Sequence, residues 1–209
     1  MKEGIILLTR GTRPSMVEQE LTRNVGILVF DGVEELDFVG PLEVFGVAGM
    51  LGKDAFKVST IGVKGRPIEA INGLRVTPDF DLDGPPNVDI LVVPGGNGTR
   101  KLMTDKRVLG FIRGSAARCE LVTSVYTGAL VLAAARLLDG KRATTHWSAL
   151  DELREFSEVV VEHRRFIKQG KIITSAGISA GIDMSLHIVG LLCGAKLKRD
   201  TAKEMEYGR

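Results

Sequence analysis

Short runs of apolar, often β-branched residues alternate along the chain with longer stretches in which apolar positions recur every three or four residues. The short runs are typical of strands, and the longer stretches are typical of helices that bury one face. We predict strands over residues 24–30, 56–63, 73–77, 89–93, 121–125, 159–161, 165–167 and 171–174. We predict helices over residues 34–51, 105–118, 127–138, 149–156 and 178–193. Pro41 falls early in the first helical pattern, where it would suit a first turn or the start of the helix proper.

Strands separated by helical stretches imply βαβ units, and these imply a parallel sheet with helices on both faces. Residues 89–93 (DILVV) and 127–138 (TGALVLAAARLL) are apolar almost throughout, which favours burial on every side. We therefore expect one α/β domain, a three-layer sandwich around a doubly wound, mostly parallel, flavodoxin-like sheet. Such sheets bind ligands beyond the carboxyl ends of their strands. Three loops should meet at that edge: residues 31–37, 94–98 and 126–127.

Residues 1–23 fit no part of this pattern, so we predict an N-terminal extension followed by a domain over residues 24–209. Residues 15–18 (SMVE) match a capping box that would open a short helix, and a disordered extension is the alternative. The first residues hold only a five-residue apolar run and no cleavage site, and we find no later stretch long enough to span a membrane. We expect a cytoplasmic protein without a membrane partner.

Composition excludes several classes of protein. A hydrophobic content of 44% with 26% charged residues is ordinary for a folded domain and argues against disorder. The net charge is only +2, and no basic cluster is large enough to suggest nucleic-acid binding. Basic residues near the carboxyl end fit the solvated face of a last helix: Lys196, Lys198, Arg199 and Lys203. Cys119 and Cys193 form no CxxC pair, which favours a reducing compartment.

The most informative junction is Val125-Tyr126-Thr127-Gly128, which passes directly from a buried strand to a buried helix. A residue at such a turn lies at the sheet edge beside the unpaired N–H groups of a helix N-terminus. Many hydrolases display a nucleophile on a strand–turn–helix elbow of this kind. On geometry alone, the interpretation that Thr127 merely caps the helix is equally good.

Two further features lie at the same predicted edge. Gly95 and Gly96 follow a buried strand, and they would let backbone N–H groups approach a ligand or an oxyanion, or would simply form a tight turn. Asp37 stands in an otherwise apolar stretch (LDFVGP), either as a helix cap or as a desolvated functional carboxylate. His146 and Trp147 would line a pocket or form a packing pair. The three histidines have no metal-ligand spacing, so we expect no metal and no cofactor.

Taken together, five motifs resemble the PfpI/ThiJ superfamily, which has the class I glutamine-amidotransferase-like fold. These motifs are LDxxGP, PGG, TSVxTG, GKRATTHW and AGIxAGID, in that order, and the resemblance covers roughly residues 24–195. The most similar branch contains the isocyanide hydratases and the N-terminal domains of certain AraC-type regulators. The resemblance implies a small-molecule ligand and a homodimer in which first-loop and first-helix residues lie near the partner.

In isocyanide hydratases, a cysteine at the elbow attacks the isocyanide carbon and an acid on the first loop handles protons. The resemblance places Asp37 at the acid, Thr127 at the residue that hydrogen-bonds the thiolate, and Tyr126 at the cysteine. It further implies a positive φ at Tyr126, with the tyrosine ring in a cleft between Asp37 and the glycine turn. We also expect desolvation to raise the pKa of Asp37.

The resemblance assigns the substrate-binding part of the site to four residues. Gly96 matches the backbone donor near the reacting atom, and Gly95 belongs to the same turn. His146 and Trp147 match residues that flank the pocket.

Tyr126 limits how much of the hydratase activity the resemblance implies for this chain. A thiol of pKa about 8.5 supplies a few per cent of thiolate at neutral pH, whereas a phenol of pKa about 10 supplies roughly a tenth of a per cent of phenolate. Cys119 cannot substitute, because it lies on the order of 20 Å away at the other end of the strand. We expect a hydratase-like pocket that has lost or altered its catalysis; the alternative is a ligand-binding or regulatory protein. A third hypothesis makes Tyr126 an acid/base group in a different reaction.

Overall fold

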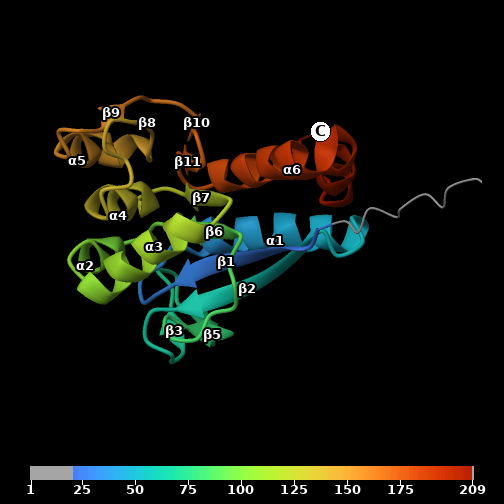
Figure 1. The fold of residues 1–209 in the computed structure, drawn as a ribbon, viewed down its shortest axis with the longest axis horizontal. Coiled ribbons are helices and arrows are strands. Elements are labelled where there is room, and N and C mark those ends of the chain that lie inside the picture. The colour runs from blue at the N-terminus through green and yellow to red at the C-terminus, as the bar shows by residue number, and fades with distance from the viewer. Residues whose placement is uncertain (1–20, 209) are drawn as a thin grey trace, which may run out of the picture.

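The computed structural model describes residues 21–208, and Figure 1 shows their arrangement. Residues 1–20 and 209 lie outside the described part, so the capping box at 15–18 and the predicted extension stay predictions. The first strand includes Arg23, one residue before the predicted start of the domain.

The centre of the molecule is a seven-stranded sheet of order β10-β11-β7-β6-β1-β2-β5. Every neighbouring pair is parallel except β10–β11. The strands are β1 (Arg23–Val29), β2 (Phe56–Gly62), β5 (Phe80–Asp81), β6 (Ile90–Val93), β7 (Leu121–Ser124), β10 (Phe166–Gln169) and β11 (Ile172–Ser175). All residues of β6 and β7 are buried, as expected for central strands covered on both faces.

Helices flank the sheet in two groups (Figure 1). Helices α1 and α6 pack against each other, and α4 contacts α2, α3 and α5. The helices are α1 (Glu35–Leu51), α2 (Thr99–Leu102), α3 (Lys106–Arg118), α4 (Gly128–Ala134), the 3₁₀ turn η1 (Trp147–Ala149), α5 (Leu150–Arg154) and α6 (Ala180–Glu204). The predicted α/β sandwich with a mostly parallel sheet is confirmed.

Two small sheets complete the fold. An antiparallel pair joins β3 (Ile68–Glu69) to β4 (Arg75–Val76), and a parallel pair joins β8 (Arg142–Ala143) to β9 (Val160–Val161). The strands predicted over 73–77 and 159–161 therefore exist, but they lie outside the main sheet. The sequence pattern missed β3, β5 and β8, because two residues are too few to show an alternation.

Several helix boundaries differ from the prediction, and the short helix α2 was not predicted. Helix α4 ends at Ala134 rather than at 138, and Arg136 has a positive φ of 64° just beyond it. Helix α1 begins at Glu35, so Pro41 lies inside the helix, beyond its first turn. Helix α6 continues to Glu204 across a kink at Gly194, whose φ is 90°.

The longer α6 also corrects the expectation that no segment is long enough to span a membrane. Among the described residues, this one helix has the length and apolarity to do so. In the structure α6 packs along α1, and its buried face includes Met184, Ile188 and Val189. The basic residues near its end are exposed, as predicted for a solvated face. We therefore interpret α6 as a core helix of the domain.

Candidate functional site

The carboxyl ends of β1, β6 and β7 bring the three predicted loops together. Val33 and Gly96 form an isolated antiparallel bridge, and the Glu34 N–H donates to the Gly95 carbonyl over 2.9 Å. Gly128, at the start of α4, lies so close to the end of β6 that a Cβ there would come within 2.0 Å of the Val93 carbonyl oxygen. The predicted meeting of the loops at one edge of the sheet follows from this parallel register.

Tyr126 occupies the turn between β7 and α4 with a φ of 54°. A positive φ at a bulky residue costs on the order of 1–3 kcal/mol, so neighbouring contacts must hold it. Its N–H donates to the Ala176 carbonyl over 3.3 Å, and its carbonyl accepts from Thr145 Oγ1 over 2.6 Å. The expected backbone conformation is present, and two segments distant in sequence hold it.

The Tyr126 ring lies in a slot between two glycines. A Cβ on Gly95 would come within 2.7 Å of Tyr126 Cδ1, and a Cβ on Gly177 within 2.7 Å of Tyr126 Cδ2. The His146 ring packs against it edge to face, with centroids 4.8 Å apart. The ring therefore lies beside Gly95, as expected, and its other edge lies against Gly177. No hydrogen bond in the described chain joins Tyr126 to Asp37.

Asp37 is fully buried in the first turn of α1. Its Oδ2 accepts from the Gly95 N–H over 3.0 Å, whereas Oδ1 has no hydrogen-bond partner in the described chain. Burial raises the pKa of Asp37 to about 8; the Gly95 N–H opposes this rise, and the charge of Glu34 adds to it. The expected direction is confirmed, and the carboxyl is mostly protonated at neutral pH. The helix-cap interpretation is wrong, because Glu34 is the N-cap residue.

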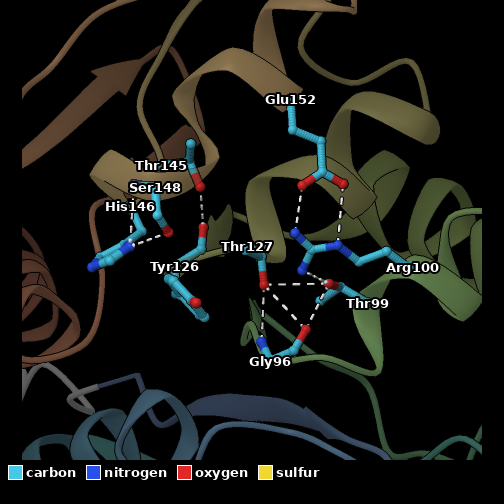
Figure 2. A network of polar contacts seen from close by, with 9 residues as sticks. All are labelled: Gly96, Thr99, Arg100, Tyr126, Thr127, Thr145, His146, Ser148 and Glu152. Atoms are coloured by element: carbon cyan, nitrogen blue, oxygen red, sulfur yellow. Dashed lines mark hydrogen bonds and ion pairs between the residues drawn. The ribbon is translucent and has the colours of Figure 1, made fainter.

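Thr127 is fully buried and is tied to the glycine turn (Figure 2). The Gly96 N–H donates to Thr127 Oγ1 over 2.9 Å, and Thr99 Oγ1 donates to the Gly96 carbonyl over 2.7 Å. Thr127 is the N-cap residue of α4, as the capping interpretation requires, but its side chain makes no cap hydrogen bond to the helix and bonds to the glycine turn instead. The Gly96 amide, which the resemblance would direct at a reacting atom, is thus engaged by Thr127, and the neighbouring Gly95 amide by Asp37.

A second layer of polar contacts lies behind Thr127. Arg100 donates to both carboxylate oxygens of Glu152 and, over 3.3 Å, to Thr99 Oγ1, so the network joins α5 and α2 to the turn (Figure 2). The sequence pattern alone did not indicate Thr99, Arg100 or Glu152, and the AGIxAGID motif did not indicate that Gly177 lies against the Tyr126 ring. The segment GTR directly after PGGN was the available signal for Thr99 and Arg100.

His146 and Trp147 continue from the Tyr126 ring towards solvent. His146 Nδ1 lies 2.8 Å from Ser148 Oγ (Figure 2). The His146 ring centroid is 5.1 Å from that of Trp147. Burial lowers the pKa of His146, which favours the neutral imidazole. Trp147 is 68% exposed, so it lies at the outer end of this row of rings. Within residues 21–208, no three His, Cys, Asp or Glu side chains group to hold a metal.

The fold and site define a class of protein: an α/β sandwich with a strained strand–helix turn facing a glycine turn. A crystal structure of a ThiJ/PfpI family protein from Pseudomonas syringae matches with a TM-score of 0.83 and 29% identity, covering 97% of this chain and 83% of that one. The DJ-1/PfpI family description matches residues 23–191. The chain belongs to the DJ-1/PfpI family.

Two relatives indicate which members it is similar to. The isonitrile hydratase of Pseudomonas putida is 37% identical over 183 residues, which are 88% of this chain and 78% of the hydratase. The HTH-type transcriptional regulator GbdR of Pseudomonas aeruginosa is 31% identical over 189 residues, 90% of this chain. The match spans only 51% of the regulator, so this chain corresponds to about half of it.

Proposed function

We propose that this protein binds a small molecule at the Tyr126 turn and lacks the thiol-dependent hydration that its similarity to isonitrile hydratase would suggest. The observation that carries the proposal is the position of the Tyr126 ring, held between Gly95 and Gly177 at the elbow. By resemblance this is the position of the nucleophilic cysteine. The phenol fills space that a thiol would leave to substrate, and a hydroxyl oxygen is intrinsically a weaker nucleophile than a thiol sulfur.

The surrounding groups support binding rather than covalent catalysis. The Gly95 and Gly96 N–H groups already donate to Asp37 and Thr127, so neither is directed at an oxyanion. A protonated Asp37 is a hydrogen-bond donor rather than a general base. The rings of His146 and Trp147 offer apolar faces next to the turn. A neutral, mostly apolar molecule fits the faces of these two rings.

Assays with a panel of isonitriles distinguish a protein that only binds these compounds from one that hydrates them. We expect no turnover to formamides by the wild type or by Tyr126→Phe, and measurable turnover by Tyr126→Cys, which restores the thiol beside Asp37 and Thr127. Binding is followed through the fluorescence of Trp147, the single tryptophan of the chain, whose ring adjoins His146. Wild-type turnover comparable with that of the cysteine variant would overturn the proposal.

A regulatory role is the second candidate, favoured by the 31% identity to GbdR over 90% of this chain. That relative is named a transcriptional regulator, so the comparison does not support the prediction that nucleic acid is excluded as a partner. In this case the domain would sense a ligand and transmit that signal to DNA binding. Gel-shift titration of this chain with and without ligand tests this role. A ligand-dependent, sequence-specific shift would support it, and the absence of a shift would contradict DNA binding by this chain.

We further propose that the chain forms a homodimer through the start of α1. Asn72, in the β3–β4 turn, bonds to Glu35 through its backbone N–H (2.7 Å) and its side-chain amide (2.8 Å). These bonds hold the turn beside the start of α1, and exposed apolar residues occur in both segments: Leu36, Ile71 and Leu74. Sedimentation velocity at micromolar concentration should show a dimer that Leu74→Asp dissociates. A wild-type monomer would contradict the proposal.

A further inference from the structure

A cavity separate from the Tyr126 turn opens at the same edge of the sheet. Its volume is about 180 Å³, and its lining comes from the ends of β1 and β2, from the start of β3 and from the segment around α2. The lining residues are Phe30, Asp31, Val63, Lys64, Ile68, Gly98, Lys101, Leu102 and Asp105. The glycine-rich loop after β6 separates this cavity from the Tyr126 turn. Its Gly96 bonds to Thr127 at the turn, whereas its Gly98 lines the cavity.

The walls of the cavity are apolar and held in place. Phe30, Val63, Ile68 and Leu102 are all buried, at 3–6% exposure. Arg66 ties the β2–β3 loop to Asp31 through a 2.6 Å ion pair, and the Arg107 guanidinium donates to the Val63 carbonyl over 3.1 Å. A cavity whose walls are fixed by such contacts is formed before a ligand arrives, which lowers the entropic cost of binding.

The charges around the opening favour an anion. Asp31 accepts from Arg66 and from the Glu69 N–H, and Asp105 accepts from the N–H groups at the start of α3, so both carboxylates are engaged within the protein. Lys64 and Lys101 are exposed and line the same cavity, and no ion pair involves either ammonium in the described chain. The cavity therefore combines a buried apolar interior with two lysine ammonium groups that form no ion pair within residues 21–208, beside an Asp105 carboxylate bonded only to backbone N–H groups.

We propose that this cavity binds a short-chain aliphatic carboxylate. Its alkyl chain would lie against Phe30, Ile68 and Leu102, and its carboxylate would lie between Lys64 and Lys101. A volume below the roughly 300–1,000 Å³ of drug-sized sites limits the ligand to a few carbon atoms. The apolar walls disfavour a fully hydrated ion such as inorganic phosphate. This site does not depend on the function proposed for the Tyr126 turn.

Titration of the full chain with hexanoate, followed by amide NMR, tests the proposal. We expect saturable shifts at the amides of Lys64, Ile68, Gly98 and Lys101, with the Tyr126 and His146 amides unmoved. Hexylamine and inorganic phosphate are the comparison probes and should give no saturable shift at these positions. Saturable shifts by hexylamine, or hexanoate shifts centred on Tyr126, would overturn the assignment.

A second experiment compares two double variants that lose the same net charge. The double substitution Lys64→Gln/Lys101→Gln should weaken hexanoate binding by about tenfold, because each partly exposed charge contributes on the order of 0.7 kcal/mol. The control Lys57→Gln/Lys203→Gln removes the same net charge from exposed positions outside the cavity lining and should leave the affinity unchanged. Equal affinity in the two double variants would refute the role of the cavity lysines.

Discussion

The ring of Tyr126 and the backbone of Gly177 are in such close contact that a Cβ on Gly177 would lie 2.7 Å from Tyr126 Cδ2 and 3.2 Å from Cγ. Real Cβ atoms essentially never approach another heavy atom this closely. The absence of a side chain at position 177 is therefore a condition for the aromatic ring at position 126. This coupling links the end of β11 to the turn before α4.

We predict that Gly177→Ala lowers the free energy of unfolding by about 1–3 kcal/mol, the usual cost of overpacking. In the Tyr126→Cys background the loss should fall by about 1 kcal/mol but should not vanish, because the same Cβ would also lie 2.9 Å from His146 Cδ2. Urea denaturation of the four proteins in this double-mutant cycle measures the coupling. Additive losses would show that the ring does not occupy the slot.

Gly95→Ala is the matched comparison. A Cβ there would lie 2.5 Å from the Thr127 backbone nitrogen as well as 2.7 Å from the Tyr126 ring. Because the closer obstacle is backbone, the substitution should be destabilising in both the wild-type and the Tyr126→Cys backgrounds. Denaturant midpoints of the two Gly95→Ala proteins check this. Rescue by Tyr126→Cys would contradict the described position of the turn.

Asp37 should make stability depend on pH. Its pKa is about 8 in the folded protein and near 4 in the unfolded chain, so between these values only the folded state holds the proton. The stabilisation is complete below pH ~4 and declines by up to about 1.4 kcal/mol per pH unit until pH ~8. Asp37→Asn, which mimics the neutral acid, should remove this slope. Unfolding free energies of both proteins from pH 5 to 8 test it, and parallel curves would count against a buried neutral Asp37.

Thr127 should matter through its oxygen atom. Thr127→Val removes the acceptor of the buried Gly96 N–H, and an unsatisfied buried donor costs about 1–3 kcal/mol. Thr127→Ser keeps Oγ and should lose less than about 1 kcal/mol. Thermal or chemical unfolding distinguishes the two. Equal losses in Val and Ser would indicate that the methyl group, rather than the hydrogen bond, stabilises the turn.

Cys119 should be chemically inert in the folded protein. Burial raises the pKa of its thiol to about 11, and Sγ donates to the Val88 carbonyl over 3.1 Å. Thiolate is the reactive species, so alkylation by iodoacetamide at pH 7.5 should reach Cys119 only after denaturation. Peptide mass spectrometry of labelled native and unfolded protein measures this. Rapid native labelling of Cys119, or its rapid oxidation by mild peroxide, would mean that the reactive centre has been misplaced.

Local sequence determined the strands, most helices and the edge at which the site lies. The apolar runs 24–30, 89–93 and 121–125 are long enough to show that they are buried strands, and the helical stretches between strands require parallel pairing. Parallel pairing in turn places the residues after each strand at one edge, which is why Asp37, Gly95 and Tyr126 were found from sequence. These features depend on periodicity and chain direction, which neighbouring residues encode.

Only the tertiary structure determines which groups contact those residues. The slot around Tyr126 joins residues separated by more than thirty positions, Gly95 on one side and Gly177 on the other. The hydrogen bonds that engage the Gly95 and Gly96 amides also come from distant segments, as does the Arg100–Glu152 pair behind them. Periodicity reports which face of an element is buried but not which residue it meets. Those partners are set by the packing of helices and loops onto the finished sheet.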